Sequence, residues 1–235
     1  MLLVFGGDGE MLSTARRLGT NQIPALGINF GKLGFLTQFD ACELESALPS
    51  ILGGDFTVGE RMMLDCSLLR GEPKKRQFLA LNDVVISRGA LSRLVRLRLY
   101  VDGEPATSYA SDGLIISTPV GSTAHSLSAG GPILEPDFEA MIITPICAHS
   151  LANRPVVICA GHAVEVHAEK FTQELGLTVD GQVYEPLEPG DRIRVVRSSH
   201  KFLQVIRRTQ AFYRTLRGKL GWGGTIENQN SPHPR

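Results

Sequence analysis

The chain has no excess of charge of either sign, because its 24 Lys and Arg residues balance its 24 Asp and Glu residues. That balance gives no global reason to expect a nucleic acid or an anionic membrane as a partner. Although 43% of the residues are hydrophobic, no uninterrupted apolar stretch is long enough to suggest a membrane span. An anionic substrate must therefore be held by a local arrangement of groups.

Cysteine is scarce, and its four positions are far apart: Cys42, Cys66, Cys147 and Cys159. This spacing argues against a zinc site and against a disulfide framework. We expect the four cysteines to be small buried residues of a protein in a reducing compartment. No charged-then-apolar signal segment precedes the first predicted strand, so we expect a cytoplasmic protein.

Two common phosphate-binding motifs are also missing, the Gly-x-x-x-x-Gly-Lys-Ser/Thr P-loop and the Gly-x-Gly-x-x-Gly dinucleotide motif. The chain has Gly6-Gly-Asp-Gly9 instead. The apolar run at 2–5 predicts a buried parallel strand before it, and residues 10–18 predict a helix that Gly19 closes. Glycines let the backbone approach a phosphate chain, and free N–H groups at a helix start attract anions. The pattern indicates a phosphate site.

A carboxylate in such a loop needs its own explanation. Phosphates repel Asp8 unless a metal, a proton or a hydroxyl acceptor needs a carboxylate there. Asp8 is therefore a candidate base or metal ligand of a phosphotransferase. An ordinary Gly-Asp-Gly turn is the alternative, which the short motif alone favours.

The hydrophobic periodicity divides the chain into two kinds of structure. Residues 1–60 alternate strands and helices and predict an α/β, Rossmann-like domain, to which a returning segment at 201–222 contributes a strand and a basic helix. Residues 61–200 show a period of two with recurrent turn signals, which predicts an antiparallel, β-sandwich-like domain. The fold class is therefore α+β. We expect the polar tail at 223–235 to be disordered.

Two further stretches could carry chemistry. Asn82 and Asp83 lie between apolar residues, so both can be satisfied only if one end of a strand opens on a site; an Asn-Asp turn is the alternative. In 112–132 an apolar strand leads into a loop rich in glycine and hydroxyl groups. The hydroxyls come from Ser117, Thr118, Ser122, Thr123, Ser126 and Ser128. Such a loop suits a nucleoside in a largely apolar pocket, and a Ser/Thr-rich loop without a ligand is the alternative.

Three arginines at 93, 96 and 98 could form a phosphate patch. Arginines at alternating strand positions more often form a solvated face, and we favour that interpretation.

Together these motifs resemble those of the NAD kinase family. The matching segments are Gly6–Gly9, Asn29–Phe35, Leu81–Asp83, Asp112–Pro132, Asn153-Arg-Pro155 and Val179–Gln182. Gly-Gly-Asp-Gly alone is shared with phosphofructokinases and diacylglycerol-type lipid kinases. The resemblance implies a phosphofructokinase-like first domain and an NAD-binding second domain. It also implies phosphoryl transfer from ATP, or from polyphosphate, to the adenosine 2′-hydroxyl of NAD, with a divalent ion such as Mg²⁺. A homodimer or homotetramer would complete the site.

The resemblance assigns roles to individual residues. Asp8 would be the base that takes the proton from the 2′-hydroxyl, with Gly7 and Gly9 shaping the phosphate loop. Asn82 and Asp83 would hold ribose hydroxyls. The remaining candidates around the dinucleotide are Phe35, Asp112, Thr123, Ala124, His125, Ser128 and Asp180. No residue is assigned to the metal.

Some positions depart from the family pattern. His125 replaces a tyrosine, Asp83 shortens a glutamate, and Ala148 replaces a proline. Family members also carry a strand and a helix before the Gly-Gly-Asp-Gly loop, and we expect such a segment to be encoded upstream of Met1.

Two rival functions stay open. A lipid kinase of the same superfamily would need an apolar acceptor pocket in place of the polar loop at 123–128. A catalytically inactive dinucleotide-binding module would bind NAD and turn nothing over.

Overall fold

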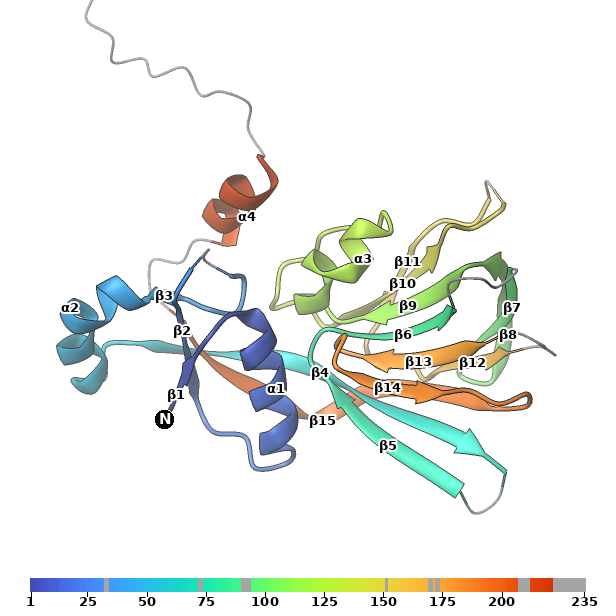
Figure 1. The fold of residues 1–235 in the computed structure, drawn as a ribbon, viewed down its shortest axis with the longest axis horizontal. Coiled ribbons are helices and arrows are strands. Elements are labelled where there is room, and N and C mark those ends of the chain that lie inside the picture. Colours follow the sequence, from blue (N-terminus) through green and yellow to red (C-terminus); the bar gives the residue numbers. More distant parts are fainter. Residues whose placement is uncertain are drawn as a thin grey trace, which may run out of the picture.

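The computed structural model describes residues 1–31, 34–71, 74–89, 94–150, 152–168, 171, 174–206 and 212–221. Figure 1 shows a smaller α/β part and a larger β part joined by long strands. The helices are α1 (Asp8–Leu18), α2 (Ala41–Leu52), α3 (His125–Ser128) and α4 (Phe212–Leu220), with a 3₁₀ turn at Val120–Thr123. The first eight strands are β1 (Leu2–Phe5), β2 (Ala25–Asn29), β3 (Phe39–Asp40), β4 (Thr57–Arg70), β5 (Lys74–Ala80), β6 (Asp83–Arg88), β7 (Val95–Val101) and β8 (Glu104–Ser111). The others are β9 (Gly113–Ser117), β10 (Ala140–Ile146), β11 (Val156–Cys159), β12 (Val164–Ala168), β13 (Leu175–Val179), β14 (Val183–Pro186) and β15 (Arg192–Ile206).

Among the described residues, nine strands form one sheet and six form the other. The first sheet has the central order β1-β2-β15-β12-β7-β8, and β3, β4 and β5 attach to it. The second has the order β11-β10-β9-β6-β13-β14. The pairs among β1, β2 and β3 are parallel, whereas the pairs within the second sheet are antiparallel. The mixed α+β fold predicted from the sequence is confirmed.

The strand β15 connects the two parts. It pairs with β4 along almost its whole length, with an irregularity between Arg197 and Lys201. Beyond that irregularity, Gln204 pairs with Ala25 of the parallel strand β2. The first sheet therefore runs without a break from the α/β part into the β part.

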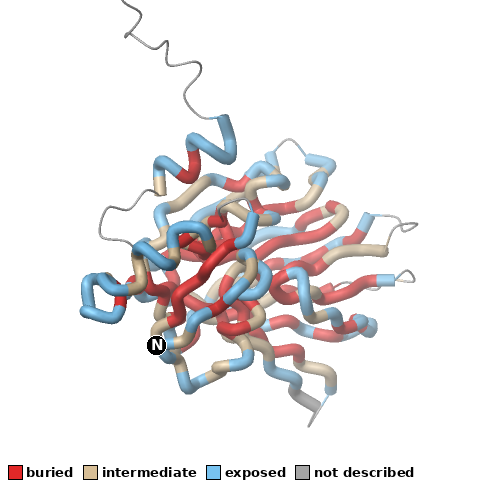
Figure 2. The backbone as a smooth tube through the Cα atoms, turned by 60° about the vertical axis from the view of Figure 1, so that its left-hand side comes forward, coloured by how far each residue is buried: buried red, intermediate tan, exposed pale blue. Residues whose placement is uncertain are grey.

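The main core lies between the two sheets, where alternate residues of the strands point inward. Leu64 of β4, Leu97 of β7 and Ile116 of β9 are fully buried members of this core. Burying each such side chain stabilises the fold by roughly 1.5–3 kcal/mol. Figure 2 shows the buried residues concentrated in the strands and the exposed ones in loops and in α2 and α4.

The helices α1 and α2 cover opposite faces of β2. Ala25 packs with Met11 of α1, whereas its neighbour Leu26 packs with Ile51 of α2. Consecutive strand residues face opposite sides, which explains the separation. The side chain of Asp40 caps α2 by accepting a hydrogen bond from the backbone N–H of Cys42.

Several details differ from the sequence predictions. The first helix begins at Asp8 rather than at residue 10, because Gly7 already serves as its N-cap. The basic helix after β15 is described from Phe212 and ends at Leu220 rather than at the predicted residue 217, and residues 209–211 of the prediction lie outside the described residues. Arg93 and the tail at 223–235 lie outside the described residues.

The prediction of four buried cysteines is wrong for three of them. Cys66 faces the core, but Cys42, Cys147 and Cys159 are exposed. Cys42 lies at the start of α2, Cys147 follows β10, and Cys159 ends the edge strand β11. These element ends lie outside the space between the sheets.

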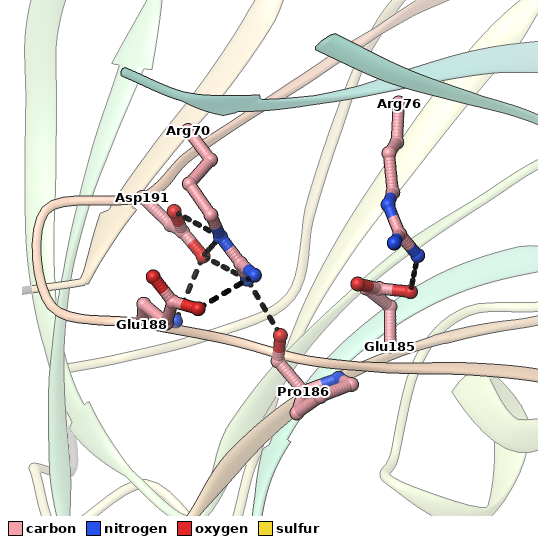
Figure 3. A network of polar contacts seen from close by, with 6 residues as sticks. All are labelled: Arg70, Arg76, Glu185, Pro186, Glu188 and Asp191. Carbon is pink, nitrogen blue, oxygen red and sulfur yellow. Dashed lines mark hydrogen bonds and ion pairs between the residues drawn. The ribbon is translucent and has the colours of Figure 1, made fainter. Parts of the chain in front are cut away.

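Charged side chains fasten the far end of the β part (Figure 3). The Arg70 guanidinium binds the buried carboxylate of Asp191 with N–O distances of 2.7 to 3.1 Å. It also donates to the Pro186 carbonyl at 2.7 Å and pairs with Glu188 at 2.9 Å. Arg76 of β5 pairs with Glu185 of β14. These contacts tie the β4–β5 hairpin to the segment that leads from β14 into β15.

Candidate active site

Asp8 lies at the start of α1, where the N-terminal end of the helix dipole favours a negative charge. Its carboxylate accepts backbone N–H bonds from three consecutive residues. Phe35 donates to Oδ2 at 2.8 Å, and Leu36 and Thr37 donate to Oδ1 at 3.0 and 3.2 Å. The sequence indicated a carboxylate beside a phosphate loop, but gave no sign that the loop at 34–37 would hold it.

That loop approaches the carboxylate so closely that residue 34 must be glycine. A Cβ atom on Gly34 would lie 1.8 Å from Asp8 Oδ1 and 2.6 Å from Thr37 Oγ1. The loop is fastened from behind as well, because Gln204 of β15 donates to the Leu36 carbonyl at 2.8 Å. Asp8 therefore has a fixed position relative to the central strand.

A pocket of about 380 Å³ opens at the end of β6 and β13 in the second sheet. This volume is in the range of pockets that bind small molecules. Its lining comes from Asn82, Asp83, Val85, Ser87, Ala124, His125, Thr178, Asp180 and Gly181. Five of these residues were candidates from the sequence: Asn82, Asp83, Ala124, His125 and Asp180.

Asp180 shapes this pocket from underneath. It has a positive φ of 52° in the turn between β13 and β14, and its side chain is fully buried. The carboxylate accepts the backbone N–H groups of Leu81, Asn82 and Asp83 at 2.8 to 3.1 Å. Asp180 thus holds the Asn82–Asp83 turn in place with oxygens that are already occupied by protein donors.

Among the titratable groups that line the pocket, Asp83 has the largest shift in pKa. Burial, together with the nearby charge of Asp180, raises the pKa of Asp83 to about 7. Burial raises the pKa of Asp180 as well, but three N–H donors and Arg16 oppose that rise. Near neutral pH, Asp83 can therefore carry a proton and donate a hydrogen bond.

The amide of Asn82 has an unmet hydrogen-bonding need. Its Oδ1 atom is buried and has no hydrogen-bond partner among the described residues. A buried acceptor without a partner is uncommon, because it loses its bonds to water on folding. Ser117 Oγ, one residue after Ile116 in β9, is in the same state.

Most hydroxyls of the loop at 117–128 bind the protein itself. Thr118 donates to the Leu81 carbonyl, and Thr123 donates to the Val120 carbonyl. Ser126 shares a hydrogen bond of 2.9 Å with Thr144. These bonds complete the backbone bonding of a tightly folded loop. The expectation that the three residues face a nucleoside stays a prediction, because a hydroxyl that donates to the protein can still accept a hydrogen bond from a ligand.

The other predicted residues lie outside this pocket. Asp112 forms an ion pair with Arg88 at 2.7 Å, and Ser128 is exposed at the end of α3. The ring of Phe35 contacts Phe212 of α4 at a centroid distance of 6.4 Å, with Lys219 Nζ 5.1 Å from its centre.

Gly7 and Gly9 lie at the start of α1, and the turn between β13 and β14 contacts this helix. Gln182, next to the pocket residue Gly181, donates from Nε2 to the Gly9 carbonyl at 2.7 Å. Figure 1 shows the turn between β13 and β14 on the side of α1. The helix that carries Asp8 therefore adjoins the pocket.

Sequence reasoning missed four lining residues: Val85, Ser87, Thr178 and Gly181. A signal for two of them was available, because Asp83, Val85 and Ser87 alternate along β6 and so share one face. Thr178 joins them because it pairs with Val85 across the ladder. That pairing could not be read from the sequence alone.

Among the described residues, no group of three or more His, Cys, Asp and Glu side chains could hold a metal ion. Within the same part of the chain, no helix is long and apolar enough to cross a membrane.

Comparison with known proteins decides the family. Residues 1–56 match the ATP-NAD kinase N-terminal domain, and residues 81–207 match the ATP-NAD kinase C-terminal domain. The chain belongs to the NAD kinase family. As an NAD kinase it is a phosphotransferase that phosphorylates NAD.

Individual relatives agree with this assignment. The chain is 48% identical to the NAD kinase of Geobacter metallireducens, over 95% of this chain and 79% of the relative. It is 46% identical to the NAD kinase of Desulforamulus reducens, over 93% of this chain and 76% of the relative.

Two solved structures share the fold. Yeast NADH kinase complexed with NADH is 30% identical, with a TM-score of 0.90 over 97% of this chain and 67% of that chain. An NAD kinase from Archaeoglobus fulgidus in complex with ATP is 28% identical, with a TM-score of 0.75 over 93% of this chain and 80% of that chain.

Proposed function

We propose that Asp8 is the base of this NAD kinase and that the pocket holds the acceptor nucleoside of NAD. The observation that carries the proposal is the hydrogen bond from Gln182 to the Gly9 carbonyl. This bond joins the turn between β13 and β14, which lines the pocket, to Gly9, the residue that follows Asp8. A carboxylate and a nucleoside pocket at this junction suit abstraction of a proton from a ribose hydroxyl.

The hydrogen bonds of Asp8 leave room for this role. A carboxylate oxygen can accept about two hydrogen bonds. Oδ2 accepts the N–H of Phe35, whereas the N–H groups of Leu36 and Thr37 both go to Oδ1. Oδ2 thus retains an acceptor position for the 2′-hydroxyl. As the oxygen attacks the γ-phosphorus of ATP, its proton passes to Asp8 and ADP leaves.

Asn82 and Asp83 would hold the ribose. The Oδ1 atom of Asn82 lacks a partner and can accept a hydrogen bond from a ribose hydroxyl. Because its pKa is raised to about 7, Asp83 is protonated in part of the molecules at neutral pH and can then donate to a hydroxyl oxygen. His125, Ala124 and Thr178 complete the rim of the pocket.

ATP is the proposed phosphate donor, supported by the family and by the ATP complex of the Archaeoglobus relative. The described residues do not form a metal cage of their own. A magnesium ion would therefore arrive with the phosphates of ATP, as is common for Mg²⁺. When bound, it would supply neutralisation of phosphate charge, and we assign no residue to it.

The phosphate acceptor can be the oxidised form, NAD, or the reduced form, NADH, since the yeast relative is an NADH kinase. Parallel assays with NAD and NADH, each with ATP and with polyphosphate, separate the four combinations. We expect ATP with NAD to give the highest kcat/KM.

We also propose a homodimer or homotetramer in which a neighbouring subunit completes the site. The support is that Asp112 and Ser128 lie outside the pocket of their own chain, while Val156 and Val157 of the edge strand β11 are exposed. Light scattering measures the mass. Free thiols at all four cysteines fit the cytoplasm as the proposed location.

The test of the central proposal is Asp8→Asn. Asparagine keeps the shape of the side chain and loses the proton acceptor, so we expect kcat to fall by roughly two to four orders of magnitude. Calorimetry should show an NAD dissociation constant close to that of the parent. If NADP formation stays within about threefold of the parent, well short of the loss of a general base, Asp8 is not the base.

A further inference from the structure

Gln182 uses both ends of its side-chain amide to bind α1. Its Nε2 donates to the Gly9 carbonyl at 2.7 Å, and its Oε1 accepts a hydrogen bond from the Arg16 guanidinium. Gly9 is in the first turn of α1 and Arg16 in the last, so the amide links the backbone of the first turn to a side chain from the last turn. Gln182 itself lies in the turn between β13 and β14, more than 160 residues away in sequence.

Arg16 extends these contacts to the floor of the pocket. Its NH1 atom lies 3.6 Å from Oδ2 of Asp180, whose side chain is fully buried. Asp180 in turn binds the N–H groups of Asn82 and Asp83. A continuous series of polar contacts thus joins the start of α1 to the turn that faces the pocket.

We propose that Gln182 is a positioning residue for phosphoryl transfer, which fixes the place of Asp8 relative to the NAD pocket through its bond to the Gly9 carbonyl. The inference rests on the proposed role of Asp8 as the base. Gly9 directly follows Asp8, so a shift of its carbonyl moves the carboxylate. Misplacement of reacting groups by about 1 Å can lower a rate by about 100-fold.

The chemistry of the amide explains why residue 182 is glutamine. An amide donates and accepts hydrogen bonds, a carboxylate only accepts, and a thioether does neither effectively. Glutamate could therefore keep the contact with Arg16 but would lose the donation to Gly9. Methionine, of similar length, would lose both.

These differences define the experiment. Gln182→Met, Gln182→Glu and the parent are compared, with Gln77→Met as the control because Gln77 is exposed on β5, away from the pocket residues. The measurements are kcat, KM for NAD, the NAD dissociation constant and Tm. We expect both Gln182 variants to lose about tenfold to 100-fold in kcat, with an NAD dissociation constant within about threefold of the parent, since the pocket lining is unchanged. Gln77→Met should match the parent.

Other outcomes overturn the inference. A Gln182→Glu variant with parental kcat would show that the bond to Gly9 has no positioning role. A loss that appears in KM and the dissociation constant, with kcat unchanged, would assign Gln182 to substrate binding. If Gln182→Met is too unstable to assay, Gln182→Glu still decides, because it retains the contact with Arg16. Asp8→Asn separates the two proposals. If Asp8→Asn keeps the parental kcat, Asp8 is not the base. If Asp8→Asn loses its activity while both Gln182 variants keep the parental kcat, only the positioning role of Gln182 is refuted.

Discussion

Asp8 depends on a residue that has no side chain. Gly34 allows the turn at 34–37 to approach the carboxylate, and Thr37 Oγ1 accepts the Gly34 N–H at 3.0 Å. Because a Cβ at residue 34 would overlap Asp8 Oδ1, either the turn or the carboxylate must move when the glycine is replaced.

We therefore expect Gly34→Ala to lower kcat by about 100-fold or more, the usual cost of a misplaced catalytic group. Gly31→Ala is the matched control, because a Cβ there would meet nothing within 4 Å. Steady-state kinetics with NAD and ATP measure both variants. Rates within about threefold of each other, far from the loss that misplacement implies, would mean that the contact does not govern the position of Asp8.

Single residues also mark the limit of prediction from sequence. Asp8 could be predicted because phosphates repel carboxylates, so its presence needs a chemical reason. The bonds of Asp180 to residues 81–83 could not, because they join segments about 100 residues apart. The protein partners of the Thr118 and Ser126 hydroxyls could not be predicted either, since buried polar groups must be satisfied whether or not a ligand is present.

At the scale of elements, the network in Figure 3 offers two arginines with similar partners and different surroundings. The Arg70 side chain is 25% exposed and its partner Asp191 is 2% exposed, whereas the Arg76 side chain is 66% exposed and its partner Glu185 is 11% exposed. An ion pair contributes more when both of its side chains are shielded from water.

Arg70→Met should therefore lower the free energy of unfolding by about 2–3 kcal/mol. This is below the usual loss for a fully buried pair, since a quarter of the Arg70 side chain is exposed. Arg76→Met should cost less, about 1 kcal/mol, because water screens the exposed guanidinium of Arg76. Urea unfolding measures both, and equal losses would contradict the dependence on burial.

Strands and helices followed the sequence pattern closely, because the period of two in β4 and β7 and the helical period in α2 persist over several residues. The pairing partners of the strands could not be predicted from that pattern. The alternation of β15 identifies a strand with one buried face, but not that the same strand pairs with β4, β12 and β2. The helix start also moved, since Gly7 can act as an N-cap without any side chain.

For the whole molecule, the proton on Asp83 links stability to pH. Its pKa is about 7 in the folded state and about 3.9 in an unfolded chain. The folded state therefore binds more protons between these values, and stability falls as the pH rises from about 4 to about 7. Removing the ionisable group should remove this loss.

We expect Asp83→Asn to lose less stability than the parent between pH 5 and pH 8, by a few kcal/mol at most. Urea unfolding at the two pH values measures it, and Asp65→Asn on β4, a partly exposed position, is the control. Parallel pH dependence of the parent and Asp83→Asn would show that Asp83 is ionised throughout.

The position of β15 has a consequence for synthesis on the ribosome. This strand comes late in the chain, yet it lies in the interior of the larger sheet, where Gln204 pairs with Ala25. Until β15 has emerged, β2 and β12 lack their common neighbour, and β4 exposes the edge that β15 will cover. Such long-range pairing slows folding and leaves open strand edges exposed for longer. The nascent NAD kinase therefore cannot join the separate parts of its larger sheet until β15 has been synthesised.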